Sequence, residues 1–81
     1  MKIMKDYTAR AATFIPDEGE ILAEEGLKVA LADVTANPGV DTATIDIPKD
    51  EMNGHVDTLL QFGFKIHHQI PTMLTMIRVL R

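Results

Sequence analysis

The sequence predicts an α/β fold of the α+β sandwich type, with two helices packed on one mixed sheet of four strands in the order βαβαββ. Apolar and polar residues alternate from position 42 to 47, as in a strand with one buried face. Two other segments, around 23–34 and 52–60, carry apolar residues at helical spacing. A last apolar run, Met73 to Leu80, follows a turn at Pro71-Thr72. A short chain that contains both strand-like alternation and helical spacing is expected to pack its helices on a sheet.

The first strand and the first helix are predicted between residues 5 and 39. Residues 5–14 mix β-branched and aromatic residues with alanines and are predicted as one strand. A helix is predicted to begin at Pro16-Asp17, because Asp17 can cap it and Glu20, three residues on, completes a capping box. Asn37-Pro38-Gly39 ends this helix. Its apolar stripe consists of Ala23, Leu27, Ala30, Leu31 and Val34.

The second half predicts a strand, a helix and two further strands. The alternating strand 42–47 ends at Pro48, which cannot donate to a ladder. Asp50 can cap a helix over 51–62, and Gly63 suits the left-handed position after it. The stripe of this helix consists of Met52, Val56, Leu59 and Leu60. Residues 64–70 and 73–80 are the last two strands. Because the final strand is apolar on both faces, we expect it inside the sheet or at an interface.

Composition excludes several classes of function. We expect residues 1–81 to form a single domain with a small core, which a partner subunit would support. The net charge of −4, from 12 acidic and 8 basic residues, disfavours nucleic acid as a partner. The absence of cysteine excludes disulfides and thiolate metal sites. No apolar stretch has the length of a membrane span, and no signal peptide is evident. A cytoplasmic protein is the simplest expectation.

The joints between these elements resemble those of a known family. They are Ile15-Pro16-Asp17, Asp46-Ile47-Pro48, the helix end Leu59 to Phe64, and Thr72-Met73. In this combination they resemble the carboxy-terminal half of the GNAT N-acetyltransferase fold, above all the extra half-domain appended to some bacterial GNAT enzymes. The resemblance covers about residues 10–76. It implies half of the GNAT fold for this chain.

Two departures from the GNAT pattern bear on catalysis. GNAT enzymes hold the pyrophosphate of acyl-CoA with a glycine-rich loop at a helix amino terminus. The corresponding segment here, residues 15–20, has one glycine among three acids, which would repel phosphates. Catalytic members carry a tyrosine in the helix before Gly-Phe, and Leu59 stands at that position. We therefore transfer no catalytic residue, expect no cofactor, and expect the chain to be non-catalytic by itself.

Three residues are candidates for contact with a small ligand. Asp46 lies near a strand carboxyl end, where α/β sheets bind ligands, although a turn or cap role is the more ordinary one. Tyr7 and Arg10 could line a small cleft with Thr44 and recognise an anion, the alternative being an ordinary edge strand.

Histidines and acids give no diagnostic metal or catalytic motif. His67 and His68 are adjacent on a predicted strand and should point to opposite faces. His55 shares a helix face with Glu51, so a site built from these two and a strand histidine is conceivable, but the spacing is not that of a known metal site. The acids from Glu18 to Glu25 fit a solvated helix surface better than an acid–base pair.

The last strand is the candidate surface for self-association. Met73, Thr75, Ile77 and Val79 alternate along it and form our predicted dimer interface, together with a sheet edge. Three functions remain open. The first is a non-catalytic, GNAT-like half-domain that forms a homodimer and serves as an interaction or small-ligand-binding module. The second is a piece of an N-acetyltransferase that needs a separate acetyl-CoA-binding half. The third is a small enzyme that uses Asp46 and a histidine in a cleft.

Overall fold

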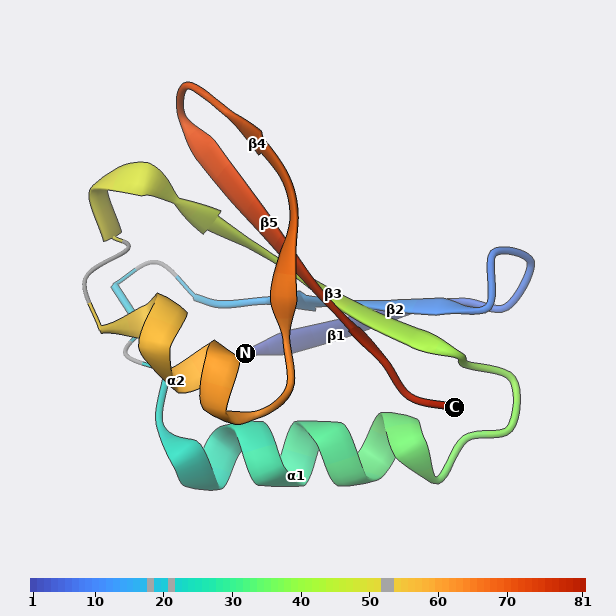
Figure 1. Cartoon of the computed structure of the whole chain (residues 1–81). Coiled ribbons are helices and arrows are strands. Elements are labelled where there is room, and N and C mark those ends of the chain that lie inside the picture. Colours follow the sequence, from blue (N-terminus) through green and yellow to red (C-terminus); the bar gives the residue numbers. More distant parts are fainter. Residues whose placement is uncertain (18, 21, 52–53) are drawn as a thin grey trace.

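The computed structural model describes residues 1–17, 19–20, 22–51 and 54–81. Within these residues the chain forms five strands, two α-helices and a short 3-10 helix (Figure 1). In chain order the elements are β1 (Lys2–Asp6), β2 (Ala11–Ile15), α1 (Glu24–Thr35), β3 (Thr42–Pro48), the 3-10 helix (Lys49–Glu51), α2 (His55–Gln61), β4 (Lys65–Ile70) and β5 (Met73–Val79). The α+β class is confirmed, but the sheet has one strand more than the sequence predicted.

The extra strand arises because the predicted first strand is a hairpin. The Asp6 side chain accepts hydrogen bonds from the N–H groups of Thr8 and Ala9, at 3.0 and 3.1 Å. Arg10 then adopts a left-handed conformation with φ 55°. Such a turn reverses the chain, and β1 pairs antiparallel with β2, from Lys2 opposite Ile15 to Asp6 opposite Ala11. No glycine, proline or asparagine marks this turn in the sequence, so the prediction of a single strand over residues 5–14 was wrong.

The strands form one mixed sheet in the order β1-β2-β3-β5-β4. β2 and β3 are parallel and are joined through α1, whereas the other three neighbouring pairs are antiparallel. The last strand, β5, lies between β3 and β4, as its apolar character on both faces predicted.

The core lies between the sheet and the two helices, which cover the same face of it (Figure 1). Phe14 from β2 and Phe64, which follows α2, pack with ring centroids 6.3 Å apart. The predicted stripe of α1 is confirmed from Leu27 to Val34, but Ala23 is exposed at the N-cap. The buried residues are Ala12, Phe14, Leu22, Leu27, Ala30, Leu31, Val34, Val40, Ala43, Ile45, Ile47, Leu59, Phe64, Leu74 and Met76.

The start of the first helix was predicted too early. The Asp17 N–H does donate to Glu20 Oε1 at 3.0 Å, as in a capping box, and the Glu20 N–H donates to the Asp17 carbonyl at 2.9 Å. Gly19, however, has φ 76°, which is not helical, so these bonds close a turn and α1 begins only at Glu24.

The second helix is shorter than predicted. It runs from His55 to Gln61, after a separate 3-10 turn that contains Asp50, and its N-cap is Gly54. Gly63 has φ 85° and occupies the predicted left-handed position past the end. Leu59 is fully buried and Val56 partly so, whereas Leu60 is 51% exposed and lies off the core face; Met52 is outside the described residues.

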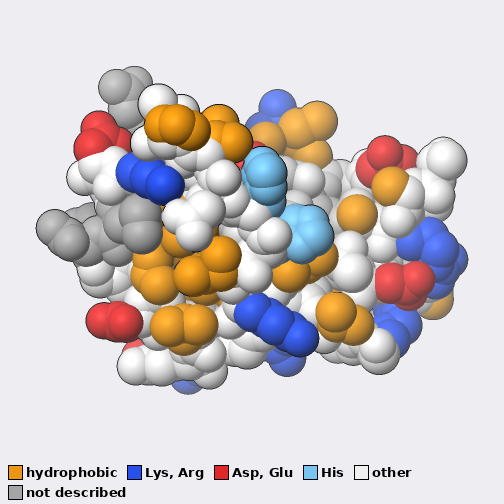
Figure 2. All heavy atoms as spheres, turned by 45° about the horizontal axis from the view of Figure 1, so that its top comes forward, with side chains coloured by type: hydrophobic (Ala, Val, Ile, Leu, Met, Phe, Trp, Pro, Cys, Tyr) orange, Lys and Arg blue, Asp and Glu red, His pale blue; other side chains and the backbone are white. Residues whose placement is uncertain are grey.

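No helix or strand among the described residues covers the second face of the sheet, which we call the open face. The residues of the open face alternate along each strand with the buried residues, and residues that are cross-strand partners point to the same face. Apolar side chains are exposed in patches between charged ones on the surface in Figure 2. None of the described helices is long and apolar enough to cross a membrane. The open face comprises Lys2, Met4, Asp6, Ala11, Thr13, Ile15, Thr42, Thr44, Asp46, Pro48, Lys65, His68, Ile70, Met73, Thr75, Ile77 and Val79.

Candidate functional site

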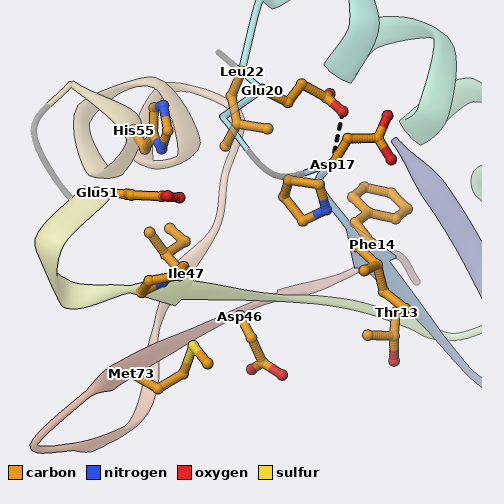
Figure 3. A pocket seen from close by; sticks show the side chains of 13 residues that line it. Thr13, Phe14, Asp17, Glu20, Leu22, Asp46, Ile47, Glu51, His55 and Met73 are labelled. Carbon is orange, nitrogen blue, oxygen red and sulfur yellow. Dashed lines mark hydrogen bonds between the residues drawn. The ribbon is translucent and has the colours of Figure 1, made fainter.

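The candidate site is a pocket of about 500 Å³ between the carboxyl ends of the two parallel strands. Pairing of β2 with β3 ends at Phe14 opposite Ile45, although β3 continues to Pro48 in its ladder with β5. The two ribbons separate beyond that point (Figure 3). A pocket of this volume is in the range that holds a small organic molecule.

The inner wall of the pocket is apolar and rigid. Phe14, Leu22 and Ile47 face it from the helix side of the sheet, and all three are buried in the core. Pro16 and Pro48 stiffen the two strand ends that flank it. An apolar wall built from close-packed core residues offers little room for rearrangement.

The ionisable side chains that line the pocket are four carboxylates and one imidazole. Glu51 and His55 lie on the helix side of β3, while Asp46 lies on the other side of the same ribbon (Figure 3). Asp17 and Glu20 complete the set, and no lysine or arginine is among the described lining residues. The electrostatic potential in the pocket is therefore negative at neutral pH.

Two of the carboxylates are already paired with a cation. The terminal ammonium group of Met1 lies 2.8 Å from Glu20 Oε1 and 3.2 Å from Asp17 Oδ2. The hydrogen bond from the Met1 ammonium group, together with a second from the Asp17 N–H, lowers the pKa of Glu20. Glu20 consequently stays ionised.

Asp46 is the one predicted ligand residue that lines the pocket. It sits on β3, two residues before the strand ends, and its side chain is exposed. Its Oδ1 accepts a hydrogen bond of 2.5 Å from the Thr75 hydroxyl, across the β3–β5 ladder. The carboxylate is thus oriented along the open face, with lone pairs left for another donor.

Tyr7 and Arg10 lie at the opposite end of the sheet, and no described pocket contains them. Arg10 donates to both oxygens of Asp41, at 2.6 and 3.0 Å, and to the Pro38 carbonyl at 2.7 Å. Tyr7 accepts a hydrogen bond from the Asn37 side chain. The guanidinium of Arg10 lowers the pKa of the Asp41 carboxyl, with a smaller effect from Arg81. These groups hold the hairpin turn to the loop before β3.

The histidines lie on α2 and on β4. No group of three or more ligating side chains comes together among the residues that the structure describes. His68 faces Thr75 on the open face, and a bulge shifts the β4 register between Ile66 and His68. Asp46 and His55 line the same pocket but lie on opposite sides of the β3 ribbon (Figure 3).

The four predicted interface residues share the open face. Met73, Thr75 and Ile77 are half-buried and Val79 is 56% exposed. Their strand pairs with β3 along one side and with β4 along the other, so β5 has no free edge for strand addition. Any contact of β5 with a partner must therefore use side chains.

Sequence reasoning missed the contribution of Phe14, Leu22 and Glu20 to a pocket. The shared face of Glu51 and His55 was visible from their spacing of four, but it did not indicate a cavity. The cavity exists because β2 and β3 separate, and no local pattern reports where two strands stop pairing.

No protein-family model matches the chain, and no curated protein matches it.

Proposed function

We propose that this chain is a non-catalytic, GNAT-like half-domain that acts as a binding module, with the pocket between β2 and β3 as its ligand site. The observation that carries the proposal is the pocket itself, which combines a buried apolar wall with carboxylates. Such a site fits a small molecule that has an apolar body and one positively charged group.

Two features support the GNAT-like, non-catalytic part of the proposal. From β2 to β5 the element order is strand, helix, strand, helix, strand, strand, which is the order that the resemblance implies. Leu59 occupies the position of the GNAT tyrosine and is fully buried, so no proton donor can act from there. The segment after β2 presents Asp17 and Glu20, which repel a pyrophosphate.

A titration with three probes tests the ligand class. We expect 2-phenylethylamine to shift the amide NMR signals of pocket residues, and its neutral isostere 2-phenylethanol to bind more weakly. The Glu51→Gln variant should weaken amine binding about two- to fivefold, the usual size for one partly exposed ion pair. Raising the ionic strength should weaken it further.

The control is Glu24→Gln, which removes the same charge from the exposed start of α1, outside the pocket. This variant should bind the amine as the unaltered chain does. Equal binding of the amine and the alcohol, or equal effects of the two substitutions, would contradict the proposed ligand class.

The alternative function is a piece of an N-acetyltransferase that needs a separate acetyl-CoA-binding half. The element order from β2 to β5 is compatible with it, because the resemblance is to one half of the GNAT fold. Calorimetry with acetyl-CoA separates the two functions. The binding module gives no heat, whereas micromolar binding by this chain alone contradicts the absence of a phosphate cradle.

A further inference from the structure

The open face has the composition of a surface that meets another surface. Met4, Ile15, Ile70 and Val79 expose between 39% and 56% of their area on it. Between them lie small threonines. Of the charged residues, Lys2, Asp6 and Lys65 lie on the two outer strands and Asp46 lies on the inner strand β3. A sheet face of this kind packs against another sheet in a sandwich.

The sheet edges are poor sites for association by comparison. β4 carries Lys65 and a bulge, and β1 carries Lys2 and Lys5. Lysines and bulges on outer strands oppose edge-to-edge pairing. A partner is therefore expected on the face of the sheet rather than at its edges.

Charges on the open face are arranged to suit a second copy of the same chain. Lys2 stands opposite Ile15, and Ile15 is level with Asp46 because Phe14 pairs with Ile45. Asp46 leans toward β5 through its bond with Thr75, and Lys2 takes part in no ion pair among the described residues. A cation on β1 and an anion between β3 and β5 thus occupy one row across the sheet.

We propose that two copies of this chain associate through their open faces, about a twofold axis parallel to the strands and between β2 and β3. Lys2 of each copy then lies over Thr75 of the other and pairs with the Asp46 carboxylate that accepts a hydrogen bond from this threonine. Under this symmetry β1 faces β5 of the second copy and β2 faces its β3. Met4 then packs on Ile77, two apolar side chains that are one row further along the sheet.

The overlap includes four strands, which are spaced by about 4.8 Å and roughly 20 Å long, hence on the order of 400 Å² per copy. Standard interfaces bury about 800 Å² per partner. The dimer is therefore weak and forms at micromolar concentration or above. This association goes beyond the ligand site proposed above, with which it shares Asp46.

Reciprocal charge variants test the pairing. Lys2→Glu and Asp46→Lys should each weaken self-association about tenfold at low salt, because each replaces two attractions per dimer by two repulsions. An equimolar mixture of the two variants should associate about as well as the unaltered chain, since each mixed dimer again has two opposite-charge pairs. Sedimentation equilibrium over a hundredfold concentration range measures all four samples.

Lys65→Glu is the matched control, because Lys65 lies on the open face but on β4, outside the proposed overlap. It should leave association unchanged, and circular dichroism confirms that each variant is folded. A monomer at every concentration overturns the dimer. A dimer that persists in both single variants, weakens with Lys65→Glu, or fails to recover in the mixture overturns the proposed symmetry.

Discussion

Arg10 shows how one residue joins distant parts of this chain. Its left-handed backbone closes the β1–β2 hairpin, and its guanidinium holds Asp41 and the Pro38 carbonyl in the loop before β3. Asp41 also lies 3.3 Å from Arg81 Nε, so the end of the chain is tied to the same carboxylate. A non-glycine residue with positive φ carries strain, and here the two side-chain bonds to Asp41 offset it.

The Asp41 interaction predicts a pH dependence of stability. Because Arg10 lowers the folded-state pKa of Asp41, its contribution is fully present above the ordinary pKa of 3.8. The contribution is lost as the pH falls through the lowered pKa of the folded state. We expect Asp41→Asn to reduce the melting temperature at pH 7 and to have little effect at the lowest pH at which the chain remains folded.

Melting curves monitored by circular dichroism from pH 7 to pH 2 would check this. Asp33→Asn removes an acid that, among the described residues, pairs with Lys5 alone, at 3.3 Å on the surface, and serves as the comparison. An Asp41→Asn penalty that does not diminish toward acid pH would show that the charge is not responsible.

At the scale of the elements, Gly26 and Gly63 have opposite roles. Gly26 lies within α1, has an ordinary backbone, and an added Cβ would meet nothing within 4 Å. Gly63 follows α2 with φ 85°, a conformation that other residues adopt only with strain. Gly26 therefore weakens α1, whereas Gly63 allows α2 to end.

Alanine at these two positions should change stability in opposite directions. Gly26→Ala should stabilise the fold by about 0.5–1 kcal/mol, because alanine favours the helix. Gly63→Ala should destabilise it by about 1 kcal/mol, the usual cost of placing a side chain at positive φ. Urea denaturation measures both free energies of unfolding, and changes of the same sign would contradict the assigned roles.

At the scale of the whole molecule, one small core supports both the pocket and the open face. α2 has only seven residues, and one of its side chains, Leu59, is fully buried. The pocket wall of Phe14 and Ile47 belongs to this same core. In a chain of 81 residues the total stability is only several kcal/mol, so a single cavity threatens the fold.

Two neighbouring leucines provide the test. Leu59→Ala should cost about 2–4 kcal/mol and leave a large fraction of the chain unfolded. Leu60→Ala, next to it but 51% exposed, should cost less than about 1 kcal/mol. Equal costs, measured by urea denaturation, would mean that α2 does not pack as described.

The sequence by itself determined the elements that local periodicity encodes. The stripe of α1 from Leu27 to Val34, strand β3 and the left-handed Gly63 all depend on residues close along the chain. The inner position of the last strand also followed from its apolar residues on both faces.

Only the tertiary structure decided the fifth strand, the pocket and the open face. The hairpin depends on the Asp6 side chain and on Arg10, and the pocket on where β2 and β3 stop pairing. Asp46 could be selected as a ligand candidate because the end of its strand is predictable from the sequence. Tyr7 and Arg10, by contrast, form hydrogen bonds with residues some 30 positions away, which the sequence pattern does not reveal. Pairing between distant segments sets these features, since their free energy comes from contacts that no local pattern contains.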